Sequence, residues 1–185
     1  METTKKFIIG LFALIAFSCE QKNQVDTSQT IQNMTDKIII SNVILYCTID
    51  SAFNYFAEND LLTKWLTNKA DVEMKVGGKY ELFWTPQDPD PSNNSTYGCK
   101  VLAVDRPYYL NIEWRGNAEQ KEFMNNVRPL TNVTILFSQL DNKMTKVSLI
   151  HTGWRQDDNW EVARQYFIKA WTGSFRQLAS IVNGK

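Results

Sequence analysis

Side chains able to do chemistry are few in this sequence of 185 residues. It contains one histidine, His151, the residue type whose ordinary pKa lies closest to neutral pH. We find no Gly-x-Ser-x-Gly nucleophile elbow, no phosphate-binding glycine loop, no His-Glu-x-x-His and no Cys-x-x-Cys. One histidine cannot form a multi-histidine metal site, so the sequence predicts no metal and no cofactor.

His151 is the residue most able to contribute to a site. It continues the alternation of Val147 and Leu149, so we expect its imidazole to point inward near the end of a strand. There it could bond to the polar head of a ligand, or it could be a core histidine bonded to a backbone carbonyl. Tyr80 is the second acid–base candidate. Both are weak candidates, and binding is favoured over catalysis.

The element that must position these residues is the last one in the chain. The pattern of residues 157–182 predicts a long amphipathic helix. Asp158 and Glu161 fit a capping box, and Asn183-Gly184 supplies a stop. Helix capping also explains the adjacent carboxylates Asp157 and Asp158 more simply than catalysis does. The apolar stripe repeats at three- and four-residue steps. Its members are Trp160, Ala163, Phe167, Ala170, Trp171, Ser174, Leu178 and Ile181, widened by Tyr166, Phe175 and Val182.

A stripe this aromatic needs a broad apolar partner, and the alternating segments upstream predict an antiparallel sheet. The expected strands are residues 37–47, 71–75, 79–85, 97–104, 108–115, a strand carrying Val133, Ile135 and Phe137, and 144–153. The first strand is apolar on both faces, which is typical of a covered strand. A Val76-Gly77-Gly78 turn joins the second and third strands. The order predicts an α+β domain, a curved antiparallel sheet wrapped around the C-terminal helix.

Two short helices are expected directly after the first strand. Asp50-Ser51 caps the first, which ends at Ala57 and turns Phe53 and Phe56 inward. Asp60 caps the second, which carries Leu61, Leu62, Trp65 and Leu66. Residues 86–95 predict an exposed, mobile loop that could act as a rim or lid. The form of the polar connection 116–129 is left open.

The aromatic residues, Trp 6, Tyr 7 and Phe 10, suit either a large core or the wall of an apolar pocket. We expect the inward-facing set to form a core, part of which lines a cavity between sheet and helix. The candidate cavity residues are Trp65, Tyr80, Leu82, Trp84, Leu110, Ile112, Trp114, His151, Phe167 and Trp171.

The N-terminus predicts export and attachment to a membrane. Lys5-Lys6, the apolar run 7–17 and Ser18-Cys19 have the order of a secretory signal, and Ala16-Phe17-Ser18-Cys19 is similar to a bacterial lipobox. We therefore expect a signal peptide over residues 1–18, lipidation of Cys19, a polar tether over 19–36 and a domain over 37–185; a plain cleaved signal is the alternative. The protein would then be extracytoplasmic and lipid-anchored to a bacterial membrane.

Charge and cysteine content narrow the partners further. The formal net charge is +0, so no overall field favours nucleic acid. Cys47 and Cys99 lie in different predicted strands, and we expect two buried free thiols rather than a disulfide.

The order of several short motifs resembles a known family, the homologues of the activator of heat-shock protein 90 ATPase, which belongs to the START-like, or SRPBCC, superfamily. The motifs are Asn59-Asp60-Leu61-Leu62 with Trp65, Val76-Gly77-Gly78-Lys79-Tyr80, Gly98, Arg106-Pro107 before Trp114, Thr145 to His151-Thr152-Gly153-Trp154, and Trp171 with Leu178. The resemblance runs from about residue 37 to 182. It implies a helix-grip fold that holds apolar molecules between sheet and helix.

Three functions are compatible with these observations. The first is a membrane-anchored domain that binds a small hydrophobic or amphipathic ligand. The second is an enzyme similar to polyketide cyclases or hydrolases of the superfamily, using the same cavity. The third is a protein-interaction module of the envelope, similar to a co-chaperone. The first is favoured because of the predicted anchor, the family resemblance and the aromatic interior.

Overall fold

The computed structural model describes residues 37–184 of the chain. The predicted signal peptide, the lipidation site Cys19 and the tether over residues 19–36 lie outside the described residues. Within residues 37–184, no helix combines the length and the hydropathy needed to cross a bilayer.

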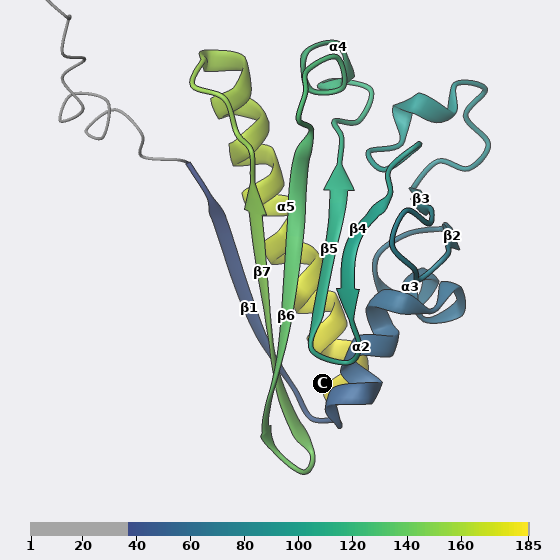
Figure 1. Ribbon diagram of the computed structural model, residues 1–185, viewed down its shortest axis with the longest axis vertical. Coiled ribbons are helices and arrows are strands. Elements are labelled where there is room, and N and C mark those ends of the chain that lie inside the picture. The colour runs from purple at the N-terminus through teal and green to yellow at the C-terminus, as the bar shows by residue number, and fades with distance from the viewer. Residues whose placement is uncertain (1–36, 185) are drawn as a thin grey trace, which may run out of the picture. The chain divides into compact units, whose positions relative to one another are not determined.

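Five antiparallel strands form the main sheet, in the order β1-β7-β6-β5-β4 (Figure 1). Their bounds are β1 Ile39–Leu45, β4 Val101–Asp105, β5 Tyr109–Trp114, β6 Thr131–Asp141 and β7 Met144–Thr152. Two further strands, β2 (Lys69–Val72) and β3 (Tyr80–Phe83), pair with each other in a separate ladder. An isolated β-bridge between Lys79 and Lys100 connects this hairpin to the segment before β4. Backbone hydrogen bonds beside the bridge, such as that from the Tyr80 N–H to the Cys99 carbonyl at 3.0 Å, strengthen the connection.

Helix α5 (Asp158–Asn183) packs across the inner face of this sheet and crosses behind it in Figure 1. The predicted stripe forms the packed face, with Trp160, Ala163, Phe167, Trp171, Phe175 and Leu178 buried. The sheet, the long helix and the two short helices after β1 confirm the expected α+β class.

The predicted cap of α5 is wrong by one residue. Asp157, not Asp158, is the N-cap, and its carboxylate accepts a hydrogen bond from the Trp160 backbone N–H at 3.1 Å. Glu161 closes no capping box, because it forms ion pairs with Arg164 at 2.6 Å and with Lys37 at 2.7 Å. At the other end, Gly184 adopts a left-handed conformation with φ 70°, as its expected role of helix stop requires.

The two short helices expected after the first strand are α2 (Ile49–Ala57) and α3 (Asn59–Trp65), and α3 contacts both α2 and α5. The cap of α2 is Thr48 rather than Asp50-Ser51, since the Thr48 hydroxyl accepts the Ser51 backbone N–H. The N-cap of α3 is Glu58 rather than Asp60, and Glu58 makes no side-chain cap bond.

An aromatic cluster fills the space between these short helices and the C-terminal half of α5. The Phe56 ring lies 4.9 Å from Trp65, 5.3 Å from Phe137 and 6.4 Å from Phe175, measured between centroids. Phe53 packs on Phe137 at 5.2 Å. This end of the interface between helix and sheet is therefore packed core.

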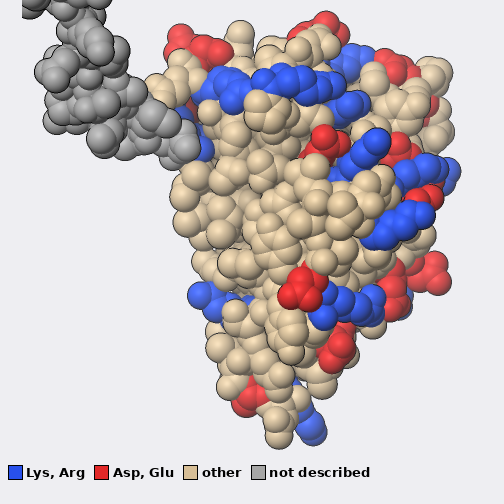
Figure 2. Space-filling model, in the orientation of Figure 1, with Lys and Arg blue, Asp and Glu red and all other residues tan. Residues whose placement is uncertain are grey.

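Strand β1 differs from the prediction because only one of its faces is covered. Ile39 and Leu45 are buried, but Ile40 is 57% exposed, and Ile38 and Ile44 are exposed as well. Within residues 37–184, no helix or strand covers the outer side of this edge strand, although apolar residues lie on both of its faces. Figure 2 shows the middle of this outer side as mostly uncharged, with charged groups above it, to its right and below it.

The segment 86–95 is packed at its end rather than exposed throughout. It contains the 3₁₀ helix η1 (Pro91–Asn93), and the following Asn94 and Ser95 are buried. The connection 116–129, for which no secondary structure was predicted, contains a short helix, α4 (Lys121–Met124), whose Met124 is buried. Both segments lie at the end of the molecule where the first turns of α5 begin (Figure 1).

The two cysteines of the domain remain unpaired, which confirms the prediction that they form no disulfide. Cys99 is buried, and burial raises the pKa of its thiol, which keeps it protonated. Cys47 is only half-buried, contrary to expectation, because it follows the edge strand β1.

Candidate ligand-binding cavity

A cavity of about 300 Å³ lies beside the middle of α5. One wall is helix α5 itself, and another is the end of β3 with the segment that follows it. The loop after β5 and the end of α3 complete it. Its lining residues are Leu66, Trp84, Thr85, Asp88, Asn93, Ser95, Trp114, Asn117, Ala118, Glu119, Tyr166, Phe167, Ala170, Trp171 and Ser174.

Small residues on α5 leave room for this cavity. Ala170 and Ser174 lie on the apolar stripe, four residues apart, and are therefore on the same helical face. The next buried stripe residues, Phe175 and Leu178, instead belong to the packed core. The stripe thus passes from cavity wall to core along a single helix.

Side-chain hydrogen bonds hold the rim of the cavity. The Asn117 amide donates to the Tyr166 hydroxyl at 3.2 Å, which ties the loop after β5 to α5. Asn94 Oδ1 accepts the Thr85 backbone N–H at 3.1 Å and so folds the segment after β3 back on itself.

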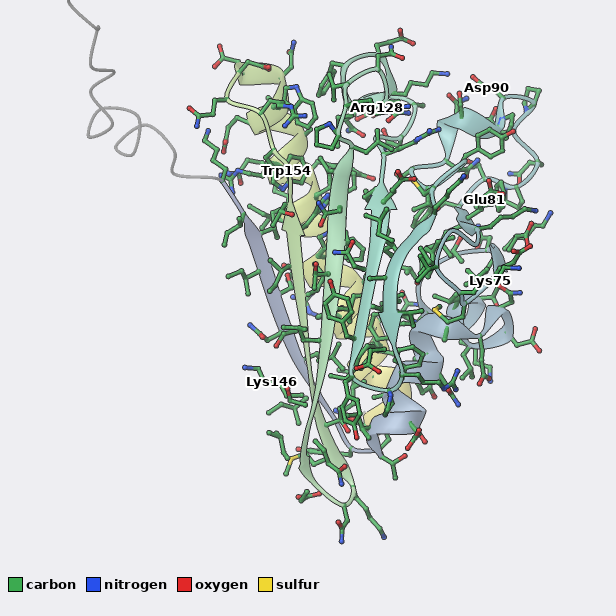
Figure 3. All side chains as sticks on the ribbon, viewed as in Figure 1. Lys75, Glu81, Asp90, Arg128, Lys146 and Trp154 are labelled. Atoms are coloured by element: carbon green, nitrogen blue, oxygen red, sulfur yellow. The ribbon has the colours of Figure 1, made fainter. Side chains whose placement is uncertain are left out.

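An ion pair connects the two rim segments. Lys121 of α4 lies 2.5 Å from Asp90, the cap of η1, which is marked in Figure 3. The bond from Lys121, with further bonds from Ser92, lowers the pKa of Asp90 to about 2. Asp90 is therefore ionised at neutral pH, and the ion pair joins the segment after β3 to the connection before β6.

Four of the ten predicted cavity residues line this space: Trp84, Trp114, Phe167 and Trp171. The other six are buried side chains that do not line it, namely Trp65, Tyr80, Leu82, Leu110, Ile112 and His151. The structure thus divides the predicted set between cavity wall and core.

His151 is fully buried and packed among aromatic rings. Its centroid lies 4.5 Å from Trp154 and 5.3 Å from Phe167. The Trp171 indole N–H donates to His151 Nδ1 at 3.3 Å, and the Trp154 indole N–H donates to the His151 carbonyl at 3.0 Å. Trp154 lies in the connection between β7 and α5 (Figure 3). Burial lowers the pKa of His151 to about 3, so the imidazole is neutral at pH 7.

Tyr80 lies in the core. Its hydroxyl donates to the Phe56 carbonyl at 2.9 Å, and burial raises its pKa above the usual value for tyrosine. Neither Tyr80 nor His151 reaches the cavity as a proton donor or acceptor. Within residues 37–184, no three histidine, cysteine, aspartate or glutamate side chains are grouped so as to hold a metal ion.

The polar half of the cavity wall was not predicted from the sequence. Asp88 and Glu119 contribute carboxylates, and Asn93 and Asn117 contribute amides. Among the described residues that line the cavity, none is lysine or arginine. The position of the cavity could have been inferred from Ala170 and Ser174, because small residues inside an aromatic stripe indicate space beside a helix.

Comparison with known proteins identifies the family of this fold. The family model described as "Activator of Hsp90 ATPase homolog 1-like protein" matches residues 46–183. The chain belongs to this family. The match covers both short helices, the sheet from β2 onward and all of α5, so the family's domain includes the cavity. A comparison with curated protein sequences gave no significant match.

Solved structures share the fold at low sequence identity. An HSP90 activator from Plasmodium falciparum is 20% identical, with a TM-score of 0.57 over 80% of this chain and 96% of that one. The Aha1 dimer from Colwellia psychrerythraea is 16% identical, with a TM-score of 0.58 over 79% and 96%. CalU16 from Micromonospora echinospora is 15% identical, with a TM-score of 0.60 over 80% and 76%. These likenesses concern the fold alone.

Proposed function

We propose that this domain binds a small hydrophobic or amphipathic molecule in the cavity beside α5. The observation that carries the proposal is the cavity itself, about 300 Å³ with Trp84, Trp114, Phe167 and Trp171 in its wall. This volume is at the lower end for small-molecule sites, and aromatic walls with a few polar groups are typical of them. Domains of this superfamily often act as small-ligand-binding modules, which agrees with the family match.

We further propose that the domain acts outside the cytoplasm, attached to a bacterial membrane by a lipid on Cys19. The support is the sequence order Lys5-Lys6, the apolar run 7–17 and Ser18-Cys19. The test is Cys19→Ser in the full chain. We expect the protein to move from the membrane fraction to the soluble fraction and to lose incorporation of labelled palmitate. Unchanged membrane association would contradict the lipid anchor.

Binding is favoured over catalysis because neither of the two acid–base candidates, His151 and Tyr80, lines the cavity. The Tyr80 hydroxyl donates to the Phe56 backbone carbonyl, and the His151 imidazole is packed among aromatic rings instead of lining the cavity. A general acid or base must lie within hydrogen-bonding reach of the group on which it acts.

Native mass spectrometry of the full chain tests the binding function. We expect the wild-type protein, purified from membranes or incubated with a lipid extract, to retain a small molecule. Ser174→Leu should abolish retention, because the larger side chain extends into the cavity. Gln177→Leu makes the same type of change at an exposed position of α5 outside the cavity, and it should retain the ligand. A wild-type protein that retains nothing, or a Ser174→Leu variant that retains as much, would refute the proposal.

A further inference from the structure

Strand β1 has backbone groups that point away from the sheet. It is the edge strand beside β7 (Figure 1). The Asn183 side chain bonds to the Tyr46 N–H and the Ile44 carbonyl on the side of β1 away from β7. The direction of the backbone groups alternates along a strand, so the N–H and C=O groups of Ile40 and Asn42 point the same way. Within residues 37–184, these groups have no hydrogen-bond partner.

The sequence of β1 lacks the features that usually keep an edge strand from pairing. Its seven residues, IISNVIL, include no charged residue and no proline. Over residues 39–45 its register with β7 has no bulge. Asn183 covers the end of the edge near Tyr46, and the part at Ile40 and Asn42 stays open. Such an edge is suited to accept a further strand.

A groove of about 340 Å³ lies beside this open edge. Residues 40–43 of β1 form one side of it, and Thr172, Phe175, Arg176 and Ala179 of α5 form the other. Among the described residues that line the groove, none also lines the ligand cavity. Neighbouring strands lie about 4.8 Å apart, and their side chains alternate between the two faces. A strand bonded to Ile40 and Asn42 would therefore direct every second side chain into the groove.

The groove carries one positive charge. Arg176 is exposed and is the one charged side chain among the described lining residues. Within residues 37–184 it has neither an ion pair nor a hydrogen bond, whereas Arg164 of the same helix pairs with Glu161 at 2.6 Å. A segment in the groove is therefore favoured if it carries an acidic side chain. A second copy of this chain would bring another uncharged β1 and another Arg176, without an acid.

We infer that this groove binds an extended peptide segment of another protein, which adds to the sheet beside β1 and directs an acidic side chain toward Arg176. The peptide backbone bonds to the outward N–H and C=O groups of Ile40 and Asn42. Side chains on the outer face lie next to Ile40, which is 57% exposed, and apolar β-branched residues suit that position. The site is separate from the cavity, so this inference does not depend on small-molecule binding.

A synthetic peptide with this pattern is the probe. The N-acetylated, C-amidated sequence Ser-Val-Thr-Val-Asp-Val-Ser alternates valines with polar residues, one of which is acidic. One comparison peptide has lysine in place of the aspartate, and another has proline in place of the central valine, which removes an N–H needed for strand pairing. In the ¹⁵N-labelled full chain, the aspartate peptide should cause saturable shifts of the Ile40 and Asn42 amides. The lysine peptide should bind more weakly, and the proline peptide should cause no shift.

Three variants separate the charge from the strand pairing. Arg176→Glu should weaken binding of the aspartate peptide about two- to fivefold and make the lysine peptide the tighter ligand. Lys169→Glu is the matched control, because it makes the same change of charge at an exposed position of α5 outside the groove, and it should leave the preference unchanged. Ile40→Pro removes an outward N–H and no bond to β7, so it should abolish binding of both peptides.

The proposal fails if the aspartate peptide leaves the Ile40 and Asn42 amides unshifted at millimolar concentration. It also fails if Arg176→Glu and Lys169→Glu have equal effects on the preference between the two charged peptides. Sedimentation of the full chain tests the other occupant of the edge: a wild-type dimer that Ile40→Pro converts to a monomer would show that β1 pairs with a second copy instead. If Ile40→Pro does not fold, the comparison of Arg176→Glu with Lys169→Glu still decides.

Discussion

At the scale of single residues, the histidine is structural. Its ring accepts from Trp171, its carbonyl accepts from Trp154, and its side chain is fully buried among aromatic rings. The same contacts that fix its orientation remove it from acid–base chemistry, because burial strongly disfavours the charged imidazolium.

This environment predicts a pH-dependent stability. The pKa of His151 falls from its usual value near 6.5 to about 3 in the folded protein. Between these values the unfolded chain binds the extra proton, so the free energy of unfolding decreases as pH falls below about 6.5. The contribution reaches at most about 1.4 kcal/mol per pH unit. Urea denaturation between pH 7 and 4 should show this loss in the wild-type protein.

His151→Gln is the comparison for this measurement, because glutamine also offers an acceptor to Trp171 but does not titrate. The difference in unfolding free energy between variant and wild type should shift in the variant's favour as pH falls. Since the chain has one histidine, proton NMR of the untagged protein reports it directly. An imidazole titration with a midpoint near 6.5 would contradict the buried, neutral state.

At the scale of elements, the C-terminus of α5 protects the free edge of β1. The Asn183 side chain accepts the Tyr46 backbone N–H at 2.8 Å and donates to the Ile44 carbonyl at 3.1 Å. These are backbone groups that β7, on the other side of β1, does not use. The amide therefore takes the place of a neighbouring strand at this end of the edge.

Removing that amide should loosen the edge strand. Asn183→Ala loses both hydrogen bonds, and we expect the free energy of unfolding to fall by about 1 kcal/mol. Gln177→Ala, at an exposed position of the same helix, should have almost no effect. Hydrogen exchange should show faster exchange of the Tyr46 amide in Asn183→Ala alone, and unchanged exchange there would contradict the assignment.

The two rim segments are likewise held by side chains. Asp90→Asn keeps an acceptor for Ser92 but removes the charge that pairs with Lys121. Ligand dissociation should become faster in this variant, because the segment after β3 loses its ion pair with α4 and keeps only the weaker bond from Lys121 Nζ to the Ser92 hydroxyl at 3.3 Å. In the wild type the same change should appear only as pH falls toward 2, where Asp90 becomes protonated. Stopped-flow displacement of a bound probe measures this rate, and an unchanged rate in Asp90→Asn would show that the rim does not control release.

At the scale of the whole molecule, the cavity depends on segments that are distant in sequence. The strands and α5 were predictable because their burial repeats locally, as the alternation of Val147 and Leu149 shows. The cavity was only partly predictable, because its rim relies on contacts such as Lys121 with Asp90 that no periodicity encodes. The parity of His151 correctly indicated burial, but its partners Trp154 and Trp171 became apparent only from the packing.

The cavity and the packed core lie at different positions beneath one helix. Trp114 and Trp171 line the cavity, while Trp65 belongs to the aromatic cluster with Phe56 and Phe175. A ligand that occupies the cavity therefore contacts some tryptophans and not others. The six tryptophans of the chain thus report the binding position without any added label.

The indole N–H signals of the ¹⁵N-labelled full chain test the central claim most directly. On addition of 2-acetonaphthone, an apolar aromatic ketone, we expect shifts for the signals of Trp84, Trp114 and Trp171, whose side chains line the cavity. The signals of Trp65, Trp154 and Trp160, which do not line the cavity, should move little. A spectrum in which the three cavity signals stay fixed at saturating ketone, or in which only the other three move, would contradict ligand binding beside α5.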